Sequence, residues 1–433
     1  MRKALLLALA LTAPGMAQTH LTLKEAVQRS VRCNPSMLRQ LALAQAAEAA
    51  RDRVESDLYP HLNLEAVGKT GPPGAPNFRL PGLTNAGFAQ SAGGDLIFLQ
   101  TFDFGRTSQR LLAQQHLSQA AQEESQLQRA RLSLNAVRAY GEVLLTRDLL
   151  ALALQTESTR SALVRQTLAH YRAGLVSRVD NGLAQADLAQ AQSETLELKG
   201  GLQSAQATLW AAMGEPNPPS LDLQLETLPA PLEEWPTSLD QDLAAAQAAR
   251  PELKATHHQV EAAQASLGMA QSGYNPSLNF YAAGGYIANL NGPASTPNTY
   301  GVGLALTVPV FTAGGVQAEI RQEDSKLAAA LAAEQEVLQK VQLEVQQARI
   351  RFVSQRDRRP ALEQQEKAAQ DSVKLASTRY RLGLGNLLEV QQAELTRVRS
   401  ASLLLRNRAE IWLAWLELLY VTGHLFPDFV EAS

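Results

Sequence analysis

The chain has 433 residues, of which 45% are hydrophobic and 19% are charged, so it can bury a core and is not a disordered polypeptide. Its 39 lysines and arginines are balanced by 42 aspartates and glutamates, and the net charge of -3 disfavours nucleic acid as a partner. Cys33 is the only cysteine, which excludes an intramolecular disulfide and a zinc cluster built from thiolates.

The first 17 residues have the pattern of a secretory signal peptide. Arg2 and Lys3 precede the apolar run 4–13, and small residues follow as far as Ala17, after which we expect cleavage. The residue directly after this position is Gln18 and not a cysteine, so a lipoprotein anchor is not expected. No later stretch has the roughly 18 uninterrupted apolar residues that a membrane-spanning helix needs. We therefore expect an exported chain without a transmembrane helix.

The rest of the chain contains the same pattern twice. Residues 58–64 match residues 274–280 at an offset of 216, and Tyr171 to Leu175 match Tyr380 to Leu384 at an offset of 209. The offset changes once, so the copies differ in length within one loop. The sequence therefore predicts an internal duplication. We expect a first repeat at 18–214, a proline-rich linker at 215–236 and a second repeat at 237–433.

Each copy is expected to begin with helix and to continue with two strands. Residues 22–57 have a helical pattern, with Pro35 in a first-turn position behind Asn34, and Pro60 ends that segment. Apolar residues then alternate with small ones at a period of two, clearly in the second copy and more weakly in the first. We expect strands at about 60–70, 94–104, 276–288 and 299–311.

A very long helix is expected after each pair of strands. The stretches 105–174 and 314–383 have equal length, and Pro360 is the only proline in either of them. A helix of this length would extend roughly 100 Å, so it must lie alongside other long helices. Apolar residues at three- and four-residue spacing within 127–144 predict a coiled-coil seam. The chain is expected to turn back at two hairpin tips, 173–177 and 382–386.

Four strands per chain cannot close a membrane barrel, because the smallest barrels have about eight strands and lipid does not tolerate open strand edges. Two chains would supply eight strands, and three would supply twelve. The predicted fold is mainly α with a small β part and is internally duplicated. Its long coiled-coil helices would form a helical tunnel, and its four strands would contribute to a transmembrane β-barrel shared between chains. Either assembly predicts a pore.

Several short motifs stand in this order along the chain: 21–26 (LTLKEA), Asn34-Pro35, Tyr59-Pro60, 102–105 (FDFG) and 171–175 (YRAGL). In this pattern the chain resembles the TolC-type outer-membrane efflux proteins, over essentially the whole mature sequence. The resemblance implies a homotrimer with one twelve-stranded barrel in the outer-membrane lipid and an α-barrel tunnel crossing the periplasm. It also implies an exit duct of a tripartite efflux or type I secretion system, which conducts solutes passively and is not an enzyme.

The resemblance implies two partners and a docking site for one of them. A periplasmic adaptor, or membrane fusion protein, would join the hairpin tips to an inner-membrane pump or ABC-type transporter. The family receives the adaptor on a short apolar stretch in each tip turn, whereas a purely structural role for these residues, as helix ends and caps, is the alternative. The matching residues here are Ala173, Gly174, Leu175 and Ser177 in the first copy, and Leu382, Gly383, Leu384 and Asn386 in the second.

The resemblance further implies a periplasmic gate held shut by polar and acidic side chains. Two departures from the family pattern are Gln392, at a position that is acidic there, and Gly385, at a position that is often basic. The three-residue spacing of Ser177 to Asp180 and of Asn386 to Glu389 equally fits simple helix capping. The gate candidates are Asp180, Tyr380, Glu389 and Gln392.

Two other classes of protein remain as alternatives to a channel. A soluble periplasmic coiled-coil adaptor or structural protein would carry one long hairpin, whereas this chain carries two hairpins and strands. An exported enzyme would need a catalytic constellation, and the sequence indicates none. His257 and His258 are adjacent and would point about 100° apart on a helix, so they would not share a metal. We therefore expect no cofactor and no metal site.

Overall fold

A computed structural model describes residues 20–70, 90–215, 224–225, 235–289 and 298–424. The expected signal peptide, 1–17, lies outside the described residues, as does most of the expected linker. Across the described parts, no helix combines the length and the apolar character that crossing a membrane would require.

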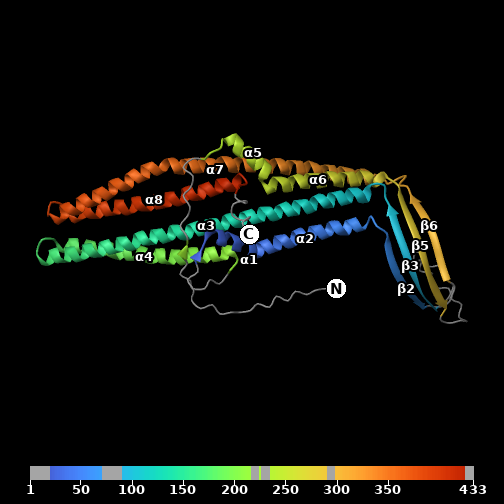
Figure 1. The fold of residues 1–433 in the computed structure, drawn as a ribbon, viewed down its shortest axis with the longest axis horizontal. Helices are drawn as coiled ribbons and strands as arrows, with labels where there is room; N and C mark the ends of the chain where they lie inside the picture. Colours follow the sequence, from blue (N-terminus) through green and yellow to red (C-terminus); the bar gives the residue numbers. More distant parts are fainter. Residues whose placement is uncertain (1–19, 71–89, 216–223, 226–234, 290–297, 425–433) are drawn as a thin grey trace. The chain divides into compact units, whose positions relative to one another are not determined.

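The elements of the two copies follow one another in the same order (Figure 1). The first copy contains β1 (His20–Leu21), α1 (Leu23–Cys33), α2 (Pro35–Ser56), β2 (His61–Thr70), β3 (Gln90–Phe102), α3 (Arg106–Arg172) and α4 (Arg178–Met213). After β4 (Gln224–Leu225), the second contains α5 (Leu239–Ala249), α6 (Pro251–Gln271), a 3-10 turn (Ser272–Tyr274), β5 (Ser277–Asn289), β6 (Asn298–Thr307), α7 (Gly315–Arg381) and α8 (Leu387–Val421). The expected fold class, mainly helical with a small β part and an internal duplication, is confirmed.

The duplication extends to the backbone. The helices α3 and α7 each have 67 residues. Phe104 and Ala313, which precede them, share the same positive φ of 48°. The glycines at the turns also have positive φ in pairs that are 209 residues apart: Gly105 and Gly314, Gly174 and Gly383, Gly214 and Gly423.

The first helical segment of each copy is broken at a proline. The expected helix 22–57 is two helices, because Asn34 has an extended backbone with ψ of 125° and ends α1. Its side chain accepts the backbone N–H of Ser36 at 3.0 Å, which supports the start of α2 at Pro35. The second copy breaks in the same way at Arg250, before Pro251. The residue before a proline is disfavoured in the α conformation, which accounts for both breaks.

The chain divides into two compact units, and each of them takes segments from both copies. The first unit consists of Met1–Arg39, Leu127–Arg250 and Val341–Ser433, and the second of Gln40–Gln126 and Pro251–Lys340. The first unit therefore carries both hairpin tips, and the second carries the sheet of four strands.

The core of the first unit lies where α1 packs with parts of α3, α4 and α8. Tyr140 and Leu209 are fully buried there, and the Tyr140 hydroxyl donates a hydrogen bond to the carbonyl of Leu21 at 3.1 Å. Trp412 packs so closely on Gly141 that a Cβ at that glycine would lie 3.2 Å from the indole ring. The expected seam on α3 thus admits a tryptophan at Gly141, and Trp412 belongs to the buried core.

A buried carboxylate attaches α5 to α7 within the same unit. The Asp242 side chain is 3% exposed, and its oxygens accept hydrogen bonds from the Trp235 indole at 3.0 Å and from the Thr237 hydroxyl. The Arg349 guanidinium lies 2.6 Å from the same carboxylate. Arg349 is itself only 28% exposed, so this ion pair is largely shielded from solvent.

The four strands of the second unit form one antiparallel sheet in the order β2-β3-β5-β6, with β2 and β6 at its edges. The register pairs Leu64 with Leu96 and Phe280 with Leu304, so apolar side chains of all four strands share one face. The exposed members of this apolar face on the edge strands are Leu62, Leu64, Tyr300, Val302, Leu304 and Leu306. The opposite face carries mainly polar and small residues, together with Ile97, Leu99 and Tyr281. On this face the hydroxyl of Thr101 donates to Asn279 at 2.7 Å.

Candidate functional site at the helical tips

The two hairpin tips are turns of the same construction (Figure 1). At the first, the N–H of Gly174 donates to the carbonyl of Tyr171 at 2.9 Å, and that of Leu175 to the carbonyl of His170 at 2.9 Å. At the second, the N–H groups of Gly383 and Leu384 repeat this pattern at 3.1 and 2.8 Å. Each glycine has a left-handed backbone, which is the usual way to end a helix with its last carbonyls satisfied.

Large apolar side chains are exposed at both tips. Leu175 and Val179 are 72% and 69% exposed, and Leu384 is 69% exposed. Helix ends of this kind usually carry polar residues, and a group of exposed apolar side chains typically marks a surface for another protein. The docking candidates on both turns, including Ala173, Ser177, Leu382 and Asn386, are thus presented on exposed turns.

The first gate candidate also caps a helix. Ser177 accepts the backbone N–H of Asp180 at 3.2 Å, and the Asp180 carboxylate accepts the backbone N–H of Ser177 at 2.9 Å. These reciprocal bonds form a complete capping box at the start of α4. The capping role of Asp180 is therefore confirmed, and it occupies one of the two carboxylate oxygens.

In the second copy, the side chain that caps the helix and the acidic side chain bind different groups. Asn386 accepts the backbone N–H of Glu389 at 2.8 Å and so caps α8. The Glu389 carboxylate instead lies 3.6 Å from the Nε atom of Arg379 on α7, and this pair is about half exposed. A Cβ at Gly385 would lie 3.0 Å from the Glu389 carboxylate and 3.2 Å from Arg379, so a side chain there would crowd the pair. Arg379 is thus the positively charged partner of Glu389 at this tip.

Tyr380 is the buried member of the candidate gate. It is 7% exposed and packs with Ala184 on α4 and with Leu387 and Val390 on α8. It therefore joins the α3–α4 hairpin to the α7–α8 hairpin. Among the described residues its hydroxyl has no hydrogen-bond partner. Burial raises the pKa of Tyr380, and the negative charge of Asp180 raises it further, so the phenol stays protonated and able to donate.

The structure thus brings Tyr380 near Asp180 and places Glu389 beside Arg379, whereas Gln392 is exposed about one turn further along α8. The sequence alone did not indicate Arg379, or His170, whose ring lies 5.9 Å from that of Tyr380. His170 and Arg379 directly precede residues of the repeated tip motif, and this proximity is the only signal that could have indicated them.

Comparison with known proteins agrees with this architecture. The Outer membrane efflux protein family matches residues 26–215 and 243–424. The outer membrane efflux protein BepC of Brucella suis is 25% identical over 294 residues, or 68% of this chain, and the chain spans 63% of that relative's length. The outer-membrane channel OprN has the same fold, with a TM-score of 0.81 at 23% identity over 93% of this chain and 90% of its own. The MtrE outer membrane channel of Neisseria gonorrhoeae, solved in an open state, has a TM-score of 0.78 at 19% identity over 93% and 89%.

The match to the family covers most of the chain, and the fold agrees with it. The chain belongs to the outer membrane efflux protein family. It is accordingly an outer-membrane protein, and its family is one of efflux proteins rather than enzymes.

Proposed function

We propose that three copies of this chain form the exit duct of a tripartite efflux or type I secretion system. Solutes would pass through it without chemical change when an adaptor opens the periplasmic tips. An inner-membrane pump or ABC-type transporter would supply the energy. The observation that carries the proposal is the combination, in one chain, of an open-edged sheet with an exposed apolar face and two hairpins that end in exposed leucines.

The sheet supports an assembly in lipid. Its edge strands β2 and β6 leave backbone groups that need partners, and lipid supplies none. A second and third copy placed edge to edge would pair these groups and close twelve strands. The apolar face would then contact lipid, and the face with Thr101 and Asn279 would line the lumen.

The tips support an adaptor that docks by apolar contact. Leu175 and Leu384 project from turns that are related by the duplication, so a trimer would present six similar sites. Behind them, Tyr380 is packed where the two hairpins meet, so separating the hairpins would expose it. A docked adaptor that spreads the hairpins would therefore act on the gate directly.

The first test is the native mass of the protein extracted in detergent from separated inner and outer membranes. We expect a trimer from the outer membrane that gives ion-conducting pores in planar lipid bilayers. A water-soluble monomer in the periplasmic fraction would contradict the proposal and favour a soluble coiled-coil protein.

Substituting both tip glycines with valine is expected to abolish adaptor-dependent export and leave the trimer intact. A Cβ at Gly174 or Gly383 would meet no atom within 4 Å, so the effect comes from the backbone. A left-handed conformation costs an L-residue about 1–2 kcal/mol, and a β-branched residue tolerates it poorly. The measurement is intracellular accumulation of a fluorescent efflux substrate in cells that lack other exit ducts.

Two controls accompany the valine variant. Gly182, in the regular helix α4, also has open space at its Cβ, and Gly182→Ala should leave export unchanged. Asparagine tolerates the left-handed conformation, so Gly174→Asn should retain much of the export. Normal export by the double valine variant would remove the tip turns from the mechanism.

Neutralising Glu389 tests the gate separately from the helix cap. In Glu389→Gln the Asn386 cap is retained, because Asn386 binds the backbone N–H, but Arg379 loses its partner. We expect the divalent-cation dependence of pore conductance to weaken by up to about fivefold, since exposed ion pairs contribute about 1 kcal/mol or less. Asn386→Ala, which removes the cap and keeps the charge, should preserve that dependence. Equal behaviour of Glu389→Gln and the unaltered protein in bilayer recordings would leave no role for this charge in gating.

A further inference from the structure

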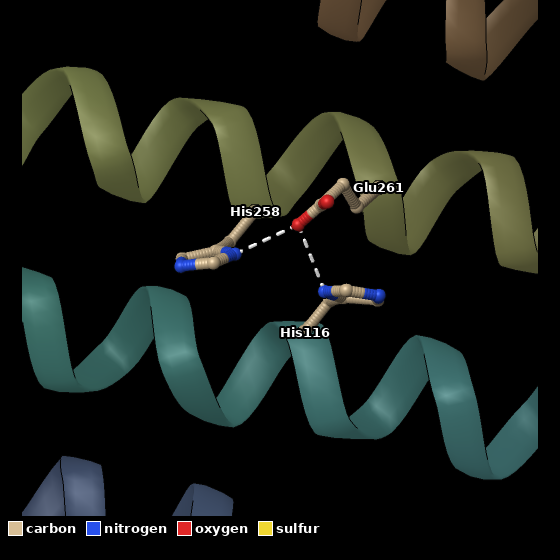
Figure 2. Close-up of side chains that lie close together, drawn as sticks. All are labelled: His116, His258 and Glu261. Atoms are coloured by element: carbon tan, nitrogen blue, oxygen red, sulfur yellow. Dashed lines mark hydrogen bonds and ion pairs between the residues drawn. The ribbon is translucent and has the colours of Figure 1, made fainter.

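Two histidines and a glutamate meet between α3 and α6 in the second unit, far from the tips in the sequence (Figure 2). One oxygen of the Glu261 carboxylate, Oε2, lies 2.9 Å from Nδ1 of His116 and 2.8 Å from Nδ1 of His258. The two imidazole rings are stacked, with their centroids 5.9 Å apart. Figure 2 shows all three side chains pointing into the space between the two helices.

We propose that His116, His258 and Glu261 form a binding site for a divalent transition-metal ion of the zinc type. Two imidazole nitrogens and one carboxylate are a donor set that such ions accept, with water completing the coordination. The three ligand atoms all lie within 4.8 Å of one another, so rotation of side chains, without movement of the helices, would bring them around one ion.

The surroundings of the three residues suit a bound cation. The side chains of His116, His258 and Glu261 are 18%, 26% and 34% exposed, so the site is sheltered and still open to an entering ion. An ion bound through Nδ1 requires each neutral ring to carry its proton on Nε2 instead.

The duplication of the fold does not account for these residues. At the offsets that relate the copies, His116 corresponds to Ser325, and His258 and Glu261 correspond to Ala42 and Gln45. The corresponding positions of the other copy therefore carry neither a histidine nor a carboxylate. Because α3 belongs to the first copy and α6 to the second, an ion here would link the two copies to each other.

His257 provides a matched control on the same helix. Its Nδ1 atom lies 3.0 Å from Glu334, and its Nε2 atom lies 3.7 Å from the other oxygen of Glu261, so it borders the site without being one of the three proposed ligands. Of the two adjacent histidines, only His258 belongs to the proposed ligand set. The second histidine of the site is His116, which lies 142 residues before His258 in the chain and was not indicated by the sequence alone.

The test uses the full chain, purified in detergent without a histidine tag, stripped with a chelator and titrated with Zn²⁺ by isothermal calorimetry. We expect one ion per chain with a Kd in the micromolar range or below. His116→Gln, which keeps a polar side chain at that position, and Glu261→Gln should each weaken binding about tenfold or more. His257→Ala should change the Kd by less than about threefold, since it removes no proposed ligand. Zn²⁺ should also raise the thermal midpoint of the unaltered protein and not that of His116→Gln.

Cobalt supplies a second readout that does not depend on affinity. Co²⁺ bound by two histidines and a carboxylate should give a visible absorption band, which His116→Gln should lack while its circular dichroism and trimer mass stay unchanged. Zn²⁺ binding by His116→Gln equal to that of the unaltered protein would overturn the proposal, and so would an equal loss in His257→Ala. Failure of the unaltered chain to bind Zn²⁺ more tightly than about 0.1 mM would also overturn it.

Discussion

Asp242→Ala is expected to lower the stability of the helical unit by about 3–5 kcal/mol, as found when one partner of a buried ion pair is removed. The substitution leaves the Arg349 guanidinium, which is 28% exposed, without its carboxylate. It also removes the acceptor for the Trp235 indole and the Thr237 hydroxyl, which hold the start of α5. The measurement is the thermal midpoint of the helical circular dichroism signal, which should fall by several degrees.

Asp240 supplies the matched control for this substitution. It lies in the first turn of the same helix but is exposed, so Asp240→Ala removes the same charge without removing a buried acceptor. Its effect should be limited to the interaction with the helix dipole, about 0.3–1 kcal/mol. Equal midpoints for the two variants would mean that the Asp242 cluster does not hold α5 in place.

Leu304→Arg is expected to prevent assembly of the membrane-embedded trimer. Leu304 is 67% exposed on the apolar face of β6, opposite Phe280. An arginine at the lipid face of a barrel costs about 2–4 kcal/mol near the bilayer midplane, and a trimer would incur this cost three times. The amount of trimer recovered from the outer membrane should therefore fall by about tenfold or more, as measured by native mass and immunoblotting.

Ala305→Arg is the control for the face of the sheet on which the arginine is placed. Ala305 is the next residue of β6 and lies opposite Asn279, on the polar face of the sheet. In the proposed barrel that face is wetted, so the same charge should be tolerated and should change only the conductance. Loss of trimer in Ala305→Arg with normal assembly of Leu304→Arg would reverse the assignment of the two faces and contradict the proposed barrel.

The channel proposal and the metal site are tested independently. The metal-binding residues lie in the unit that carries the sheet, and the docking and gate candidates lie in the other unit. If the protein binds Zn²⁺ as expected but forms no pores, the metal site is supported and the channel proposal is contradicted. If it forms pores but does not bind Zn²⁺, the channel proposal is supported and the metal site is contradicted.

Local patterns in the sequence were sufficient to predict the long helices, the four strands of the sheet and their order. Strand alternation and helical spacing have periods of two and 3.6 residues, and both are visible within a dozen residues. The tip glycines were predictable for the same reason, because a left-handed turn needs a glycine at one definite position. The break at Asn34 was missed, although Pro35 signals it, because a first-turn proline also fits the start of a helix within a longer segment.

By itself the sequence determined the duplication, the two helices of equal length, the alternating strands and the family to which the chain belongs. Only the tertiary structure decided which distant side chains meet. The pairs Asp242 and Arg349, and His116 and Glu261, lie 107 and 145 residues apart and depend on how one helix is positioned along another. A shift of about one turn between two helices would separate such pairs and leave every periodicity unchanged, so no local pattern can encode them.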